Sequence, residues 1–178
     1  METTRYIEVP AEALLAELRA IGEAVQAKGG KAEEKTVRRE VIFEITPPNR
    51  LAFVRIYTSL AKGSSAVRGC GDDAARLVLG TTVEMDGQEK FKPLAKSRRI
   101  YRTAPKGSHE VRVRAFLDRF KQAIREAYQA ALDAPTCPVC SAAPMATRDT
   151  RDGNRQFLGC VRFPECKGTR PVPPGGNP

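Results

Sequence analysis

Several features that mark particular protein classes are missing from this sequence of 178 residues. No apolar run approaches the roughly 18 residues that a membrane-spanning helix needs, and no charged-then-apolar leader opens the chain. We therefore expect a cytoplasmic protein, nucleoid-associated if bacterial, with reduced thiols and no membrane partner. Tryptophan is absent, so any hydrophobic core is built without it, although apolar residues make up 41% of the chain.

Signatures of common enzyme sites are missing as well. Residues 61–73 are rich in glycine and serine, but no GK[ST] triplet follows four residues after a glycine, which excludes a P-loop. This segment is either a phosphate-contacting loop that uses Lys62 and Arg68 or a surface loop whose glycines serve turns. The single histidine, His109, gives the isolated Cys70 no obvious general base, so we interpret Cys70 as a small buried residue.

The charge balance favours an anionic partner. Lys and Arg number 30 against 21 Asp and Glu, which gives a formal net charge of +9. Residues 1–134 contain 24 basic and 18 acidic side chains, and residues 135–178 contain 6 and 3, so both parts share the excess. Nucleic acid is the usual partner of such a chain, although a basic protein can also be merely soluble.

Four of the five cysteines form two pairs near the C-terminus, as C-x2-C and then C-x5-C after nineteen residues. Two thiolates from one tight turn, met by a second pair across a hairpin, make the tetrahedral four-sulfur site that structural zinc prefers. Two disulfides are the alternative, which the reducing compartment disfavours. We predict one structural Zn²⁺ held by Cys137, Cys140, Cys160 and Cys166.

Residues 137–169 also resemble a known family. The segments that carry the resemblance are Cys137-Pro138-x-Cys140, Gly153, Phe157-Leu158-Gly159-Cys160 and Phe163-Pro164-Glu165-Cys166-Lys167-Gly168-Thr169. They are similar to the four-cysteine zinc ribbon at the C-terminus of bacterial type IA DNA topoisomerases, in which glycine usually follows the second cysteine where this chain has Ser141. The resemblance implies binding of single-stranded DNA. It does not imply topoisomerase activity, because the chain before Cys137 is far too short for the strand-cleaving core.

The resemblance also suggests which ribbon residues contact DNA. Phe157 and Phe163 stand where the topoisomerase ribbons place stacking rings, although packing around the zinc is their alternative role. Cationic side chains of the same segment would contact phosphates. These are Arg148, Arg155, Arg162 and Lys167.

The first 134 residues have the pattern of an α+β domain. Apolar residues recur at helical spacing in residues 10–28 and in residues 109–133, where Ser108 is placed to cap the helix. Residues 37–45, 51–59, 74–85 and 90–104 alternate as strands, whereas the charged residues 31–36 are interpreted as a solvated loop. We predict an antiparallel sheet of about four strands with both helices on one face. Residues 135–170 would form the ribbon and residues 171–178 a disordered tail.

A basic cluster stands out in residues 90–106, which contain seven cations and no acidic residue. Phe91 and Tyr101 are interleaved with these charges, and cations with flat rings suit sequence-tolerant binding of single strands. An edge strand kept soluble by charge is the alternative. The predicted contacts are Lys90, Lys92, Lys96, Arg98, Arg99, Tyr101 and Arg102.

Three functions remain open on the sequence. The first is a non-enzymatic DNA-binding protein that uses both the basic domain and the ribbon and has no small-molecule substrate. The second is an adaptor whose first domain binds a replication or repair protein. The third is a metal-dependent nuclease, although Gln88 stands where the D…E-x-K pattern requires an acidic residue before Lys90. The candidate carboxylates are Asp72, Asp73, Glu84, Asp86 and Glu89.

Overall fold

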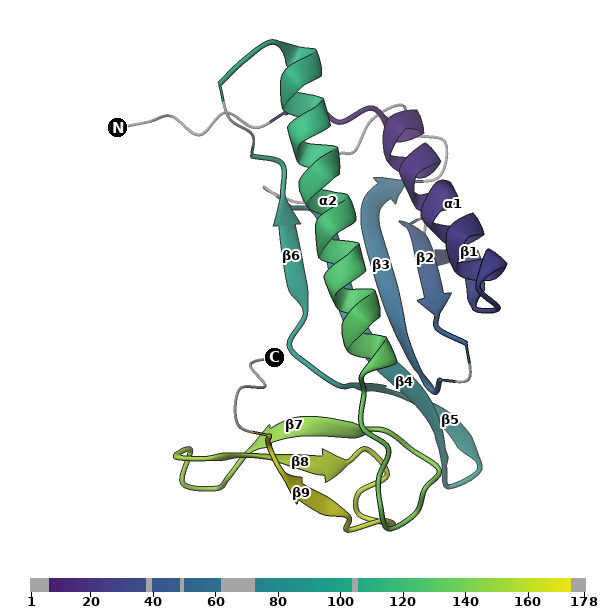
Figure 1. Cartoon of the computed structure of the whole chain (residues 1–178), viewed down its shortest axis with the longest axis vertical. Coiled ribbons are helices and arrows are strands. Elements are labelled where there is room, and N and C mark those ends of the chain that lie inside the picture. Colours follow the sequence, from purple (N-terminus) through teal and green to yellow (C-terminus); the bar gives the residue numbers. More distant parts are fainter. Residues whose placement is uncertain (1–6, 38–39, 49, 62–72, 104–105, 174–178) are drawn as a thin grey trace.

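The described part of the chain forms one six-stranded antiparallel sheet, two helices and a separate three-stranded ribbon (Figure 1). We describe it from a computed structural model, which covers residues 7–37, 40–48, 50–61, 73–103 and 106–173. The elements are α1 (Ala11–Ala27), β1 (Lys31–Val37), β2 (Glu40–Thr46), β3 (Ala52–Ala61), β4 (Asp73–Met85), β5 (Gln88–Pro93), β6 (Arg98–Tyr101), α2 (His109–Leu132), β7 (Met145–Asp149), β8 (Gln156–Cys160) and β9 (Thr169–Pro171).

The sheet has the order β1-β2-β3-β4-β5, with β6 pairing with β4 as well. Strand β4 is 13 residues long, and its two halves pair with different partners. Its second half pairs with β5, where Val83 lies opposite Lys90, and its first half pairs with β6, where Arg76 lies opposite Arg99. Strand β4 therefore pairs with both strands, β5 and β6, that contain the predicted basic cluster.

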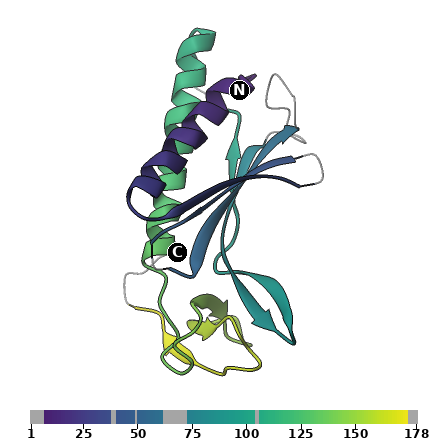
Figure 2. The same ribbon diagram turned by 90° about the vertical axis from the view of Figure 1, so that its right-hand side faces the viewer.

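Both helices lie on the same face of the sheet (Figure 2). Leu14 and Leu18 of α1 and Phe116 and Phe120 of α2 are almost fully buried, and they belong to one hydrophobic core with the inward residues of β2, β3 and β4. The Ser108 hydroxyl accepts a hydrogen bond from the backbone N–H of Val111, which satisfies a free amide of the first turn. The predicted α+β class and both helices are confirmed, with helix ends within one residue of the expected positions.

The expected loop at residues 31–36 is instead a strand, β1. It pairs with β2 along its whole length, from Lys31 opposite Thr46 to Val37 opposite Glu40. Its backbone hydrogen bonds need no apolar side chain, and at the edge of a sheet the charged side chains stay hydrated. Lys35 also contacts Glu44 of β2 at 3.4 Å, so opposite charges support the pairing where the sequence suggested only solvation.

The expected single strand at residues 90–104 is two strands, β5 and β6. Pro93 ends β5 because proline lacks the N–H that a ladder requires. Leu94 then turns inward, where it is buried and donates its backbone N–H to the carbonyl of Leu79. The sheet consequently has six strands, whereas about four were expected.

The ribbon lies beyond the C-terminal end of α2, beside the β4–β5 hairpin (Figure 1). It is a separate sheet in the order β7-β8-β9, and β9 extends to Pro171, one residue past the predicted ribbon boundary. Its buried residues, including Met145 and Leu158, belong to the same continuous hydrophobic cluster as the core of the α+β domain. In the described part of the chain, neither helix is long and apolar enough to cross a membrane.

Candidate metal centre and nucleic-acid interface

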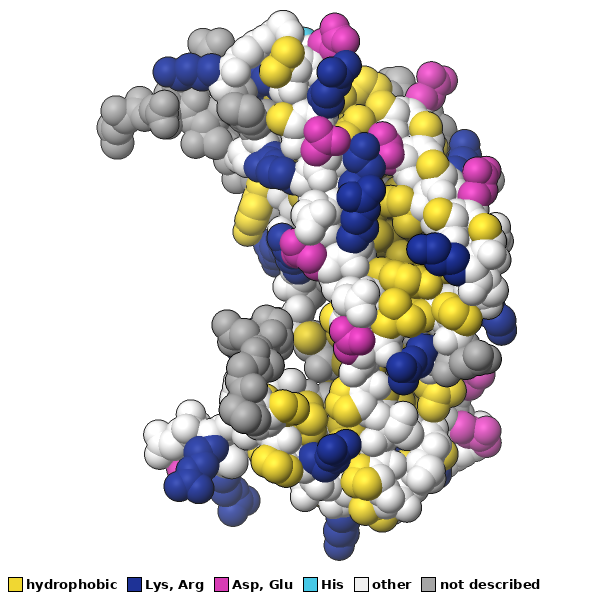
Figure 3. Space-filling model, in the orientation of Figure 1, with side chains coloured by type: hydrophobic (Ala, Val, Ile, Leu, Met, Phe, Trp, Pro, Cys, Tyr) yellow, Lys and Arg dark blue, Asp and Glu magenta, His cyan; other side chains and the backbone are white. Residues whose placement is uncertain are grey.

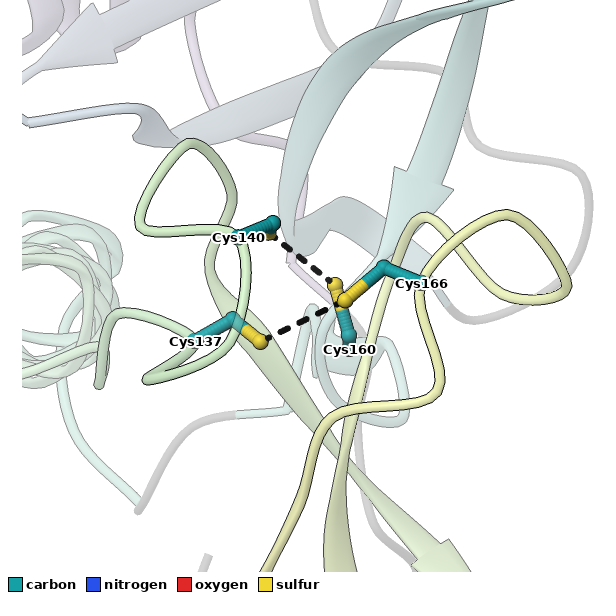
Figure 4. Close-up of side chains that lie close together, drawn as sticks. All are labelled: Cys137, Cys140, Cys160 and Cys166. Carbon is teal, nitrogen blue, oxygen red and sulfur yellow. Dashed lines mark hydrogen bonds between the residues drawn. The ribbon is translucent and has the colours of Figure 1, made fainter.

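The four cysteines are brought together by the ribbon hairpin (Figure 4). Cys137 and Cys140 belong to the turn that precedes β7, where the Ser141 N–H donates to the carbonyl of Cys137 at 2.9 Å. Cys160 ends β8, and Cys166 lies in the connection to β9. Hydrogen bonds from Cys137 N–H to Ala143 and from Cys160 N–H to Gly168 fix both pairs relative to the sheet.

The sulfur positions fit a tetrahedral zinc site. All four Sγ atoms lie within 4.8 Å of one another, with Cys137–Cys166 at 3.7 Å and Cys140–Cys160 at 3.8 Å. A tetrahedron with Zn–S bonds of about 2.3 Å has an S···S edge of about 3.8 Å, which agrees with both distances. A disulfide would need about 2.05 Å, and these cysteines are free thiols. The predicted ligand set for one structural Zn²⁺ therefore fits.

The protein environment shifts the pKa values of the thiols in different directions. Burial would raise the pKa of Cys137, but the backbone N–H groups of Cys140 and Val139, with neighbouring thiols, lower that pKa to about 7. Burial raises the pKa of Cys160 to about 12. A cluster of four thiolates is therefore stable only when a cation compensates the charge, as a bound dication does.

Two positions in the ribbon are closely adapted to this site. A Cβ atom at Gly168 would lie 2.3 Å from the Sγ of Cys137, so only glycine leaves room for that ligand. Ser141 has a left-handed backbone with φ of 53°, which explains why glycine is usual at this position in the ribbons that the sequence resembles. The turn that carries Cys137 and Cys140 therefore keeps its shape with serine, at the cost of local strain.

Three predicted contact residues gather on one side of the ribbon. Arg148 of β7 lies opposite Phe157 of β8, and both side chains approach Gly159, whose missing side chain leaves space for them. The guanidinium of Arg148 also lies 5.6 Å from the centre of the Phe163 ring. Phe163 is 51% exposed and Phe157 is half-buried, so at least Phe163 presents an accessible ring beside a cation.

The other predicted ribbon cations are more dispersed. Arg155 follows the β7–β8 turn and Lys167 precedes Gly168, and both side chains are exposed. Arg162 is half-buried and pairs with Glu165 at 3.0 Å. Both residues line a cleft toward the β4–β5 hairpin, so Arg162 faces the α+β domain.

The basic cluster at residues 90–106 does not form one surface. Lys90 and Lys92 lie opposite Val83 and Thr81 of β4, on the helix-covered side of the sheet, and Lys90 pairs with Asp86 at 3.2 Å. Arg98, on the same side, pairs with Glu126 of α2. By alternation, Phe91, Arg99 and Tyr101 lie on the opposite side. Lys96 is exposed in the connection between β5 and β6, and Arg102 is half-buried after β6.

A second group of cations and rings lies on the sheet, and local sequence patterns did not predict it. Arg55 and Tyr57 of β3 and Arg76 of β4 lie on the face that the helices do not cover, as the register with β2 and β6 shows. The guanidinium of Arg76 lies 4.6 Å from the centre of the Tyr57 ring. In the sequence, this group is indicated only by the alternation of Phe53, Arg55 and Tyr57 along one strand. The pairing of β3 with β4 is what places Arg76 beside Tyr57.

Some candidate phosphate-contacting and metal-binding residues lie outside the described residues, and others do not form a metal site. Lys62, Arg68, Cys70 and Asp72 lie outside the described residues, as do residues 174–178 and the side chain of Asp73. Glu84 and Glu89 are cross-strand neighbours at the β4–β5 hairpin. Among the residues that the structure describes, the cysteines are the only group of three or more side chains able to hold a metal.

Comparison with known families assigns the ribbon. Residues 134–175 match the family of the topoisomerase DNA-binding C4 zinc finger, and this match contains all four cysteines and strands β7, β8 and β9. The resemblance expected from the sequence is thereby confirmed. A comparison with curated proteins and a comparison with solved structures each gave no match. The α+β domain up to residue 133 lies outside the matched region.

Proposed function

We propose that this chain is a non-enzymatic DNA-binding protein that prefers single-stranded DNA and contacts it first through the zinc ribbon. The observation that carries the proposal is the match of residues 134–175 to a DNA-binding C4 zinc finger of topoisomerases. The net charge of +9 supports it, because a cationic protein gains affinity for phosphates by releasing counterions.

The ribbon surface suggests how a single strand would bind. Phe163 offers an exposed ring on which an unpaired base can stack, and the adjacent guanidinium of Arg148 can pair with a phosphate or extend the stack. Bases in a duplex are already stacked and present only their edges, so this pair of groups favours single strands. Arg155 and Lys167 supply further exposed cations on the same small domain.

The zinc site has a structural role in this proposal. Four thiolates complete a tetrahedron and leave no position for a catalytic water, so bound zinc holds the two cysteine turns together. About 35 residues bury too little apolar surface to fold alone, so metal binding supplies most of the folding free energy of the ribbon. Zinc binds only reduced thiols, so we place the protein in the cytoplasm.

An adaptor function is the second candidate, because two cations of the predicted basic cluster already have internal partners. Lys90 pairs with Asp86 and Arg98 with Glu126, which reduces the charge available for phosphates. In that case the α+β domain would bind a replication or repair protein while the ribbon holds DNA.

The test is a titration of the full zinc-loaded chain against matched single-stranded and duplex oligonucleotides, followed by fluorescence anisotropy over a series of salt concentrations. Phe163→Ala should weaken single-strand binding at least about fivefold, since stacking contributes roughly 1–3 kcal/mol per base. Arg148→Ala should reduce the salt slope by about 0.7. Val139→Ala is the matched control, because it truncates another exposed apolar side chain of the ribbon.

Equal affinity for both oligonucleotides would remove the single-strand preference. Unchanged binding by Phe163→Ala and Arg148→Ala would remove the ribbon as the contact. The same samples with Mg²⁺ should contain no cleaved DNA, and cleavage that depends on Mg²⁺ would show that a nuclease function was wrongly dismissed.

A further inference from the structure

The face of the six-stranded sheet opposite the helices has an unusual composition. In an antiparallel sheet with one covered face, the other face is normally polar. Here Ile42, Phe53 and Val78 on that face are less than 9% exposed. The Phe53 ring lies beside the Phe91 ring, with 5.9 Å between their centres, and the Arg55 guanidinium lies 5.2 Å from the centre of the Phe53 ring. This face is therefore a layer of cations and rings over apolar surface.

One row of this layer crosses three strands. Tyr57 of β3 lies opposite Arg76 of β4, which lies opposite Arg99 of β6. The Arg76 guanidinium covers the half-buried Tyr57 ring with 4.6 Å between its Cζ and the ring centre, and Arg76 itself is exposed. A base can stack on that guanidinium or displace it to reach the ring. Tyr101, which is 48% exposed, follows Arg99 on the same side.

A second group lies further along β3 and β4. Phe91 of β5 packs directly over Gly80, where a Cβ would come within 2.4 Å of the ring. The guanidinium of Arg55 lies 4.8 Å from the centre of the Phe91 ring and 5.2 Å from that of Phe53. Arg55 is held in place by Glu44 at 2.7 Å. Phe91 remains 37% exposed, so it presents part of its ring to a ligand.

On the opposite, helix-covered side of the molecule, charged side chains form pairs of opposite sign. Along α2, acidic and basic side chains alternate, as the mixed colours of Figure 3 show. Arg114 pairs with Glu110, Lys121 with Glu17 and Asp118, and Arg98 with Glu126. Such a surface has little net attraction for phosphates. On the sheet face, Arg55 and Arg76 lie against aromatic rings, and Arg55 also pairs with Glu44.

We infer that the open sheet face, through Tyr57, Arg76, Phe91 and Arg99, is a second binding surface for single-stranded DNA, distinct from the ribbon. This inference rests on the proposed function, because it assumes the same ligand. Rings that stack bases, with arginines that stack and bind phosphates, are the two elements that sequence-tolerant single-strand binding requires.

The position of this face also favours DNA as its occupant. Thr82, the register partner of Phe91, lines the cleft between the β4–β5 hairpin and the ribbon. The face therefore borders the cleft beside the ribbon, and we expect one strand of DNA to reach both surfaces. Two surfaces on one strand raise the affinity well above that of either alone.

The test uses the full zinc-loaded chain and a single-stranded oligothymidine long enough to span both surfaces. Tyr57→Ala should weaken binding at least about fivefold, whereas Tyr57→Phe, which keeps the ring, should bind as the unchanged protein does. Arg76→Ala should weaken binding and reduce the salt slope by about 0.7. Arg114→Ala removes another exposed cation, on the helix-covered side, and should leave the slope unchanged.

Two controls make the outcomes distinct. Circular dichroism and zinc content must match the unchanged protein for every variant, and Arg76 is exposed enough that its truncation should not affect folding. Because the sequence has four tyrosines and no tryptophan, tyrosine emission reports stacking directly. Oligothymidine should quench that emission in the unchanged protein and quench it less in Tyr57→Phe.

If Tyr57→Ala and Arg76→Ala bind normally while Phe163→Ala does not, the sheet-face inference is overturned and the proposed function stands. A sheet face reserved for a protein partner would give the same result. Equal losses in Tyr57→Ala and Tyr57→Phe would overturn the stacking role. If the unchanged chain binds no single strand, both the inference and the proposed function fail.

Discussion

Gly168→Ala should disable the metal site although it changes no ligand. The new Cβ would lie 2.3 Å from the Sγ of Cys137, where carbon and sulfur normally stay well over 3 Å apart. It would also come within 3.2 Å of the Val139 side chain, so the turn cannot easily move aside. The sulfur must therefore shift by more than about 1 Å, whereas zinc tolerates about 0.2 Å in its ligand distances.

The expected loss of zinc affinity follows from the contribution of one thiolate to the free energy of zinc binding. Structural zinc binds ribbon-type sites with an apparent free energy of about 10–16 kcal/mol. If four thiolates share this about equally, the loss of Cys137 costs about 2.5–4 kcal/mol. This corresponds to a decrease of roughly two to three orders of magnitude in zinc affinity. We expect Gly168→Ala to resemble Cys137→Ser in this respect.

The assay is competition for zinc between the protein and a chromophoric chelator, with the absorption of the Co²⁺-substituted protein as a second readout of tetrahedral thiolate coordination. Gly153→Ala is the matched control. Gly153 lies in the same ribbon with φ of 70°, but nothing approaches its Cβ position within 4 Å, so that variant should lose only about 1 kcal/mol of ribbon stability. Because folding and metal binding are coupled, this corresponds to a loss of only about fivefold in zinc affinity. If Gly168→Ala binds zinc as tightly as the unchanged protein and keeps the same Co²⁺ spectrum, the deduced arrangement of the site is wrong.

Three further outcomes are expected. Ser141→Gly should stabilise the ribbon by about 1 kcal/mol, because glycine relieves the left-handed strain at φ of 53°; a chelator titration that shows no gain would contradict this. Removal of zinc by a chelator should make residues 135–173 sensitive to protease while the α+β domain stays resistant, and a resistant metal-free ribbon would refute the dependence on metal. Gly80→Ala should destabilise the α+β domain by about 1–3 kcal/mol in urea unfolding, because its Cβ would overlap the Phe91 ring, and an unchanged free energy of unfolding would contradict this packing.

Local sequence signals predicted the ribbon and the helices well. The spacing of Cys137, Cys140, Cys160 and Cys166 sufficed because two short turns and one hairpin bring the thiols together without help from the rest of the chain. The helices were equally accessible, since a periodic apolar stripe and the Ser108 cap act within single segments. The strand at residues 31–37 was missed because edge pairing depends on the partner strand and leaves no apolar pattern.

The basic cluster shows what the sequence of one segment cannot determine. Residues 90–106 are uniformly cationic in sequence, but neighbouring residues of a strand face opposite sides of a sheet. Arg98 therefore meets Glu126 on α2, and Arg99 lies beside Arg76 on the other face. No property of the segment itself determines that Arg98 has an acidic partner, because that partner is 28 residues away.

The sequence by itself determined the metal ligands, the ribbon family and the α+β class, because each depends on residues close together along the chain. Only the tertiary structure decided which rings and cations share a surface. Tyr57, Arg76, Phe91 and Arg99 come from four different strands, and the register of the long strand β4 aligns them. The room that Gly168 leaves for Cys137 likewise exists only once the two halves of the ribbon have met.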